Sequence, residues 1–218
     1  QVTINITLPV GNKTDLEGKQ FIGSFTAAML SNGTKTMTKQ EIKDKLDKLK
    51  SYVNINFWGQ SISINITTYR NTINEVMPIV EDILKNPSFP ETELTKLKLE
   101  FKTYYEGQLN DPQAIAFTEI GRITSNEPKG SIFYTPTIQE SIDGMNAVTI
   151  QQVKDFYTQF FGANNGNATV IGMSSQVEVQ KLLEKTLGNF NSKAKYEKAY
   201  ASFFDTKKSK EVKETPDK

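Results

Sequence analysis

The feature that most constrains the fold is a pair of alternating segments, residues 52–58 and 61–67. In both segments every second residue is Val, Ile or Phe, and the residues between them are mostly Asn, Ser or Thr. A period of two is typical of a strand that buries one face. Gly59 stands first in the two-residue connection, where glycine suits a tight hairpin turn. The pattern therefore predicts an antiparallel hairpin that packs on one side only.

The rest of the chain adds further strands and a series of helices. Alternation over residues 2–8 predicts an opening strand, and residues 168–172 predict a late one. Apolar residues at helical spacing and capping residues predict helices near residues 17–31, 39–50, 72–85, 90–109, 112–123, 137–144, 149–160 and 175–187. Because strands and helices are largely segregated, we expect an α+β domain with an antiparallel β-sheet covered by helices on one face.

Several local details of these helices can be checked against the structure. Thr38 and Glu41, and again Thr72 and Glu75, have the spacing of a capping box. Pro78 falls inside a predicted helix and indicates an irregular first turn or a kink. The aromatic pairs Tyr104–Tyr105 and Phe160–Phe161 are interpreted as core. A buried stripe is predicted on helix 112–123 by Ala116, Phe117, Ile120 and Ile123.

Composition excludes several kinds of protein. The chain of 218 residues has a net charge of +1, so no strong field draws it to nucleic acid. No apolar run approaches the length of a membrane span. With no His and no Cys, the chain offers neither an imidazole nor a thiolate to a metal ion, and no His to activate a Ser nucleophile.

The end of the chain differs in character from the rest. Residues 205–218 contain one aliphatic residue, Val212, among many Lys and Glu, which is typical of a segment that cannot bury itself. We expect one domain over residues 1–190 and a linker or tail over residues 191–218, with residues 215–218 leading toward a further domain. The chain begins with Gln1 rather than Met, which suggests a mature or excised fragment.

An ordered series of short segments resembles the M16 family of zinc metallopeptidases, the group of pitrilysin and insulin-degrading enzyme. The series covers roughly residues 16–190 and includes Met29-Leu30 with Gly33-Thr34, residues 86–91, Asp111-Pro112, and Val170-Ile171-Gly172. The chain is most similar to the first domain of the second, non-catalytic half of long bacterial members. The resemblance implies the LuxS/mitochondrial-processing-peptidase-like metallohydrolase fold, an antiparallel sheet covered by helices.

The resemblance also shows where a zinc site is missing. Active M16 domains carry His-x-x-Glu-His on a helix that runs on to a Gly-Thr pair. Aligned on Gly33-Thr34, the two His positions fall on Ser24 and Ala28, and the Glu position falls on Ala27. A methyl group can neither bind zinc nor move a proton, so we predict no catalytic and no metal-binding residue in this chain.

Two carboxylates could correspond to the third zinc ligand of active relatives. Glu106 is the nearer counterpart, and Glu100 is the weaker candidate. Because a single carboxylate cannot replace a three-ligand site, an ordinary surface carboxylate is the favoured interpretation. We expect Ser24, Ala27 and Ala28 to line a shallow notch that opens on solvent, with Glu106 as a vestigial neighbour.

The resemblance implies a non-catalytic role. The chain is predicted to be a non-catalytic domain that shapes a substrate chamber, pairs with a catalytic M16 domain and holds unstructured peptide, with zinc only in that partner. The alternative is a purely structural or interaction protein that kept the fold. Location in the periplasm is a guess from the resemblance. The candidate chamber lining is the polar hairpin face, although the commoner role of such a face is simply to meet water: Asn54, Asn56, Ser63, Asn65 and Thr67.

Overall fold

A computed structural model of the chain describes residues 1–218 except 174, 203, 206, 207, 209, 211 and 213–218. Within these residues the strands form one antiparallel sheet in the order β2-β3-β1-β4. The hairpin predicted from alternation forms β2 and β3, which are joined at Gly59 and Gln60. The strand bounds are β1 (Val2–Pro9), β2 (Tyr52–Trp58), β3 (Ser61–Thr68) and β4 (Asn167–Ile171).

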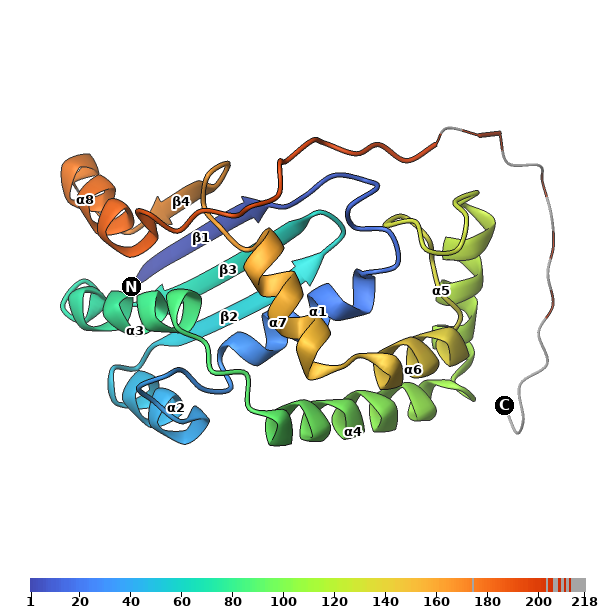
Figure 1. Ribbon diagram of the computed structural model, residues 1–218, viewed down its shortest axis with the longest axis horizontal. Coiled ribbons are helices and arrows are strands. Elements are labelled where there is room, and N and C mark those ends of the chain that lie inside the picture. Colours follow the sequence, from blue (N-terminus) through green and yellow to red (C-terminus); the bar gives the residue numbers. More distant parts are fainter. Residues whose placement is uncertain (174, 203, 206–207, 209, 211, 213–218) are drawn as a thin grey trace.

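The helices lie close to their predicted positions (Figure 1). The predicted capping box at Thr38 is confirmed, whereas the Thr72 hydroxyl makes no cap and instead shares a 3.0 Å hydrogen bond with Thr68 Oγ1. The bounds are α1 (Gln20–Leu30), α2 (Lys39–Lys48), α3 (Ile73–Lys85), α4 (Glu91–Gln108), α5 (Pro112–Ile123), α6 (Ile138–Ala147), α7 (Ile150–Phe160) and α8 (Gln176–Leu187).

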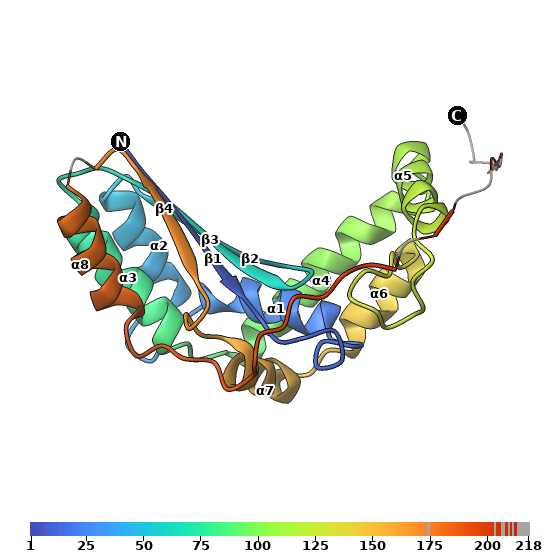
Figure 2. The ribbon, with the colours of Figure 1, turned by 90° about the horizontal axis from the view of Figure 1, so that it is seen from above.

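Helices cover one face of the sheet and leave the other bare. Figure 2 shows the sheet nearly edge-on, with α1, α2, α3, α7 and α8 on one side. The covered face supplies the centre of the core, since Ile4, Ile6 and Ile64 are at most 1% exposed. The contact with α1 is close, because a Cβ atom on Gly23 would lie 2.5 Å from the Phe57 ring. The predicted α+β class is confirmed.

On the bare side, α4 and α5 rise from the end of the helical layer as an arm. The arm and the bare sheet face enclose a concave shape (Figure 2). The predicted buried stripe of α5 is wrong, because Phe117 is 73% exposed and the helix has no buried residue. Tyr104 on α4 is also exposed rather than core, whereas Phe160 and Phe161 are buried as predicted. The physical reason is position: α5 lies at the far end of the arm, away from the sheet.

The segment after Phe190 packs on the domain. Ala194 is buried, and backbone hydrogen bonds join Lys193 and Ala194 to the carbonyl of Gln159 at the end of α7. The boundary between domain and linker at residue 190 stays a prediction, and the lead-in expected at residues 215–218 lies outside the described residues. In the described parts of the chain, no helix is long and apolar enough to cross a membrane.

Candidate functional site

The positions of the missing zinc motif lie on α1. Ser24, Ala27 and Ala28 share one face of the helix, because residues at i, i+3 and i+4 lie together. Ala27 is only 1% exposed, whereas Ser24 and Ala28 are half-buried. The expected open notch is therefore wrong at Ala27. The reason is that α1 packs against β2, α4, α6 and α7 at once, so little of its surface is free.

The groups at this place do not fit a zinc ion. Ser24 Oγ donates a 3.0 Å hydrogen bond to the carbonyl of Gln20 in its own helix, and two methyl groups complete the face. Glu106 is exposed on α4, where it lies 3.7 Å from Lys102 Nζ, and Glu100 is exposed on the same helix. Among the described residues, no three His, Cys, Asp or Glu side chains gather as metal ligands would.

The bare sheet face is built from rows of side chains that cross all four strands. Directly opposite residues of antiparallel strands lie on the same face, so the register defines each row. The middle row is Asn54, Asn65, Asn5 and Thr169. Beside it lie Asn56, Ser63, Thr7 and Asn167, and on the other side Tyr52, Thr67, Thr3 and Ile171. The five predicted lining residues therefore share one face with residues of β1 and β4.

These rows contain no charged residue, although 23% of the chain is Asp, Glu, Lys or Arg. Amides link along β2: Asn56 Nδ2 donates to Asn54 Oδ1, and Asn54 Nδ2 donates to the Tyr52 hydroxyl at 3.4 Å. Amide and hydroxyl groups can both donate and accept hydrogen bonds. A neutral face of this kind can form hydrogen bonds with the backbone of another chain, whatever the charge of that chain's side chains.

Large aromatic side chains stand at both ends of β2. Tyr52 is 62% exposed and Trp58 is 85% exposed, and both point to the bare face with the amides between them. Among the strands that the structure describes, β2 is also an edge strand, with β3 as its one neighbour. An unpaired strand edge can accept an extended peptide as an additional strand, and exposed rings can pack on its apolar side chains.

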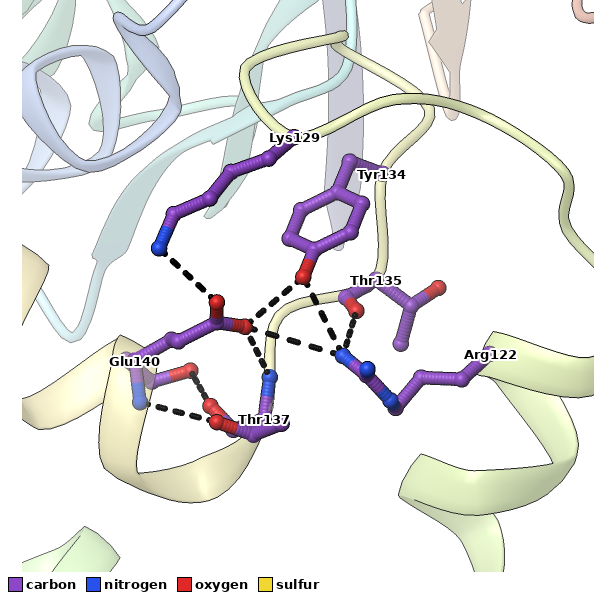
Figure 3. Close-up of polar contacts among 7 residues, drawn as sticks. Arg122, Lys129, Tyr134, Thr135, Thr137 and Glu140 are labelled. Atoms are coloured by element: carbon purple, nitrogen blue, oxygen red, sulfur yellow. Dashed lines mark hydrogen bonds and ion pairs between the residues drawn. The ribbon is translucent and has the colours of Figure 1, made fainter.

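A polar network holds the inner end of α5 to the loop that follows it (Figure 3). Arg122 Nη1 donates to the Tyr134 hydroxyl and to the carbonyl of Thr135, each at 3.2 Å. The Tyr134 hydroxyl donates to Glu140 Oε2 at 2.8 Å, and Lys129 Nζ donates to Glu140 Oε1 at 2.9 Å. Lys129, the backbone N–H of Thr137 and Tyr134 together lower the pKa of Glu140 to about 2.

A second carboxylate, Glu127, is buried and bonded on both oxygens. Ser202 N donates to Oε1 at 2.6 Å, and Ser131 Oγ donates to Oε2 at 2.7 Å. Lys13 Nζ lies 3.2 Å from Oε2. The backbone N–H of Ser202, followed by the Ser131 hydroxyl, lowers the pKa of Glu127 to about 2. Glu127 thereby joins three segments that are far apart in the sequence.

Sequence reasoning did not single out either carboxylate cluster. Thr137 and Glu140 have the spacing of a capping box, and the structure confirms that box, so a signal was present for Glu140. No local signal marks Glu127, because its partners Lys13 and Ser202 come from opposite ends of the chain.

The geometry defines a class: an α+β domain with a bare, uncharged sheet face and, among its described residues, no cluster of metal ligands. Comparison with known proteins agrees with this class. A family model described as the peptidase M16 inactive domain matches residues 147–218. An uncharacterized zinc protease of Rickettsia bellii is 20% identical over 199 residues, which are 91% of this chain and 46% of that protein.

Solved structures share the fold at low sequence identity. A peptidase M16 inactive domain from Pseudomonas fluorescens has a TM-score of 0.73 and 16% identity, over 91% of this chain and 48% of that one. A protease from Helicobacter pylori has a TM-score of 0.73 and 13% identity, over 94% and 48%. The periplasmic protease PqqL from Escherichia coli has a TM-score of 0.75 and 15% identity, over 92% and 22%.

Together, the family match over residues 147–218, the zinc protease relative and the shared fold make this chain similar to M16 peptidases and to their inactive domains. The chain spans about half the length of the curated relative that it matches. The family match begins at the end of α6 and continues beyond residue 190, so it includes the segment that packs on the end of α7.

Proposed function

We propose that this chain is a non-catalytic domain in the second half of a longer M16 protein, where it forms one wall of a substrate chamber. In this proposal the bare sheet face holds an unstructured peptide, while a catalytic M16 domain of the same protein or complex supplies the zinc. The observation that carries the proposal is the uncharged face of Asn, Ser and Thr rows, which lies on the concave side of the molecule beside the α4–α5 arm (Figure 2).

Two further observations support a peptide as the occupant. The middle row presents amide side chains on adjacent strands, and amides match the donors and acceptors of a peptide backbone. Tyr52 and Trp58 offer exposed rings at the ends of the same strand, where apolar peptide side chains could pack.

Chemical-shift mapping tests the peptide-binding wall. The chain is titrated with an unstructured peptide of mixed sequence, and we expect shifts at Asn5, Asn54 and Asn65. Replacing Asn65 by Lys should weaken binding of a basic peptide more than binding of an acidic one, because the wall then carries a charge. The matched control is Lys48→Asn on α2, on the other side of the sheet. Shifts confined to the helical side would contradict the proposal.

Pairing with a catalytic domain needs a separate test. The chain is mixed with an M16 domain that contains an intact His-x-x-Glu-His motif, and complex formation is measured by sedimentation. We expect a complex that increases peptide cleavage over that of the catalytic domain alone. Unchanged cleavage in a confirmed complex would favour a purely structural role.

A further inference from the structure

Residues 190–202, which we call the C-terminal strap, cross the domain from the helical layer to the arm. In Figure 1 this segment passes along the edge of the molecule, from the region of α7 and β4 toward α5. The strap contains no helix or strand, yet it bonds to the domain at three successive places. Its path therefore joins parts of the fold that otherwise share few contacts.

The first attachment is at the end of α7. Ala163 N donates to the carbonyl of Phe190 at 2.6 Å, and Ser192 N donates to Asn164 Oδ1 at 2.8 Å. The strap passes so close to Gly162 that a Cβ atom there would lie 1.8 Å from Ser192 N. The start of the strap is thus fixed by backbone contacts that leave no room for a side chain.

The second attachment is at the hairpin turn of the sheet. The Gln60 side-chain amide bonds to the strap backbone through both of its polar atoms. Gln60 Nε2 donates to the carbonyl of Glu197 at 2.6 Å, and Gln60 Oε1 accepts from Ala199 N at 2.9 Å. Gln60 Nε2 also donates to the carbonyl of Gly11 at 3.0 Å, and Glu197 N donates to the same carbonyl. The middle of the strap is thereby bonded to the β1–α1 loop and to the β2–β3 turn.

The third attachment reaches the arm. Ser202 N donates to Oε1 of Glu127, four residues after the end of α5, at 2.6 Å. Lys13 of the β1–α1 loop holds the other oxygen. The loop that contains Glu127 is bonded in turn to α5 through Arg122 and to α6 through Glu140 (Figure 3). No residue of α5 is fully buried, and this loop is bonded to the C-terminal end of the helix.

We propose that the C-terminal strap is a fastening device that, through Ser202 and Glu127, fixes α5, the outer helix of the arm, relative to the sheet and so sets the width of the concave face. The bearing of that width on a peptide rests on the proposed function. The fastening itself is a property of this chain, and it is testable whether or not a peptide binds.

Distance measurements between spin labels test the fastening. The chain has no Cys, so spin labels attach only at the introduced residues. Labels at Ala116→Cys on α5 and Asn56→Cys on β2, the arm pair, measure the distance between α5 and the sheet. A reference pair at Asn56→Cys and Asn167→Cys lies within the sheet. We expect a narrow distribution for the arm pair in the otherwise unchanged chain. Glu127→Ala should broaden and displace it, while the reference pair keeps its distance and Glu100→Ala, an exposed carboxylate on α4, has no effect.

A second variant keeps the test decisive if Glu127→Ala fails to fold. Ser202→Pro removes the N–H and the hydroxyl that Ser202 offers to Glu127 and fixes φ at this residue, but it leaves the Ser131 and Lys13 contacts of Glu127 in place. We expect the arm distribution to broaden in this variant too, and hydrogen exchange at the Ala199 amide to speed up. An arm distribution unchanged by Ser202→Pro would overturn the proposal, even if Glu127→Ala altered it, because the arm would then be held by the loops without the strap.

Discussion

At the scale of single residues, burial decides what the missing zinc motif can tolerate. Ala27 is 1% exposed and lies among residues of the packed core, whereas Ala116 is exposed on α5. Ala27→Met should destabilise the fold by about 1–3 kcal/mol through overpacking. Ala116→Met makes the same change in helix propensity at an open position and should stay within about 0.5 kcal/mol of the unchanged chain. Urea unfolding of both variants measures the difference, and equal stabilities would show that the Ala27 site can open.

Glu127 predicts a specific dependence of stability on pH. Its folded-state pKa is lowered from 4.5 to about 2, so the contribution of Glu127 is fully present above pH 4.5 and is lost as pH falls toward 2. Hydrogen bonds to a charged group typically contribute about 1.5–3 kcal/mol. We expect Glu127→Gln to be less stable than the unchanged chain near neutral pH. The gap should shrink through the acid range, because Gln does not titrate.

Unfolding by urea at several pH values between neutral and 2 measures this gap. Glu140 titrates over the same acid range, but it is present in both proteins and cancels in the comparison. A stability difference that stays constant down to pH 2 would show that the stabilising contacts of Glu127 do not require its negative charge.

At the scale of elements, α3 contains a proline whose ring is exposed to solvent. Pro78 lies inside the helix and is exposed, while Met77 and Ile79 on either side are buried. A proline within a helix removes one backbone hydrogen bond and typically costs about 3 kcal/mol or more. Pro78→Ala should therefore raise the free energy of unfolding without altering the core. Thermal and urea unfolding give the measurement, and an unchanged or lower stability would indicate that the chain bends at Pro78 to fit α8.

At the scale of the whole molecule, the strap should respond to a single methyl group. Gly162→Ala places a Cβ atom against Ser192 N, where there is no space. We expect the strap to leave its first attachment, which hydrogen exchange at Lys193 and Ala194 would detect as a loss of protection. Gly107→Ala on α4 is the matched control, because nothing lies within 4 Å of the added atom. That change should stabilise the helix by about 0.5–1 kcal/mol.

If Gly162→Ala leaves Lys193 and Ala194 protected while the domain stays folded, the strap is held mainly by its later contacts at Gln60 and Glu127. The strap would then be fastened from the arm side rather than from α7.

What the sequence determined by itself was the set of local structures. The alternation over β2 and β3 and the Thr38 capping box depend on residues that are near one another in the sequence. Both could therefore be predicted from the sequence, and the structure confirms them. The same alternation placed five polar residues on one sheet face. The resemblance to M16 proteins rested on an ordered series of such local segments, and the family comparison supports it.

Tertiary structure decided which apolar faces are buried and which distant groups meet. Phe117 on α5 and Ala27 on α1 stand on equally regular helices, yet one is exposed and the other is core, because only α1 has neighbours on several sides. Glu127 meets Lys13 and Ser202 from opposite ends of the chain. Local propensity cannot predict such contacts, because they depend on how the sheet and the α4–α5 arm are arranged in space.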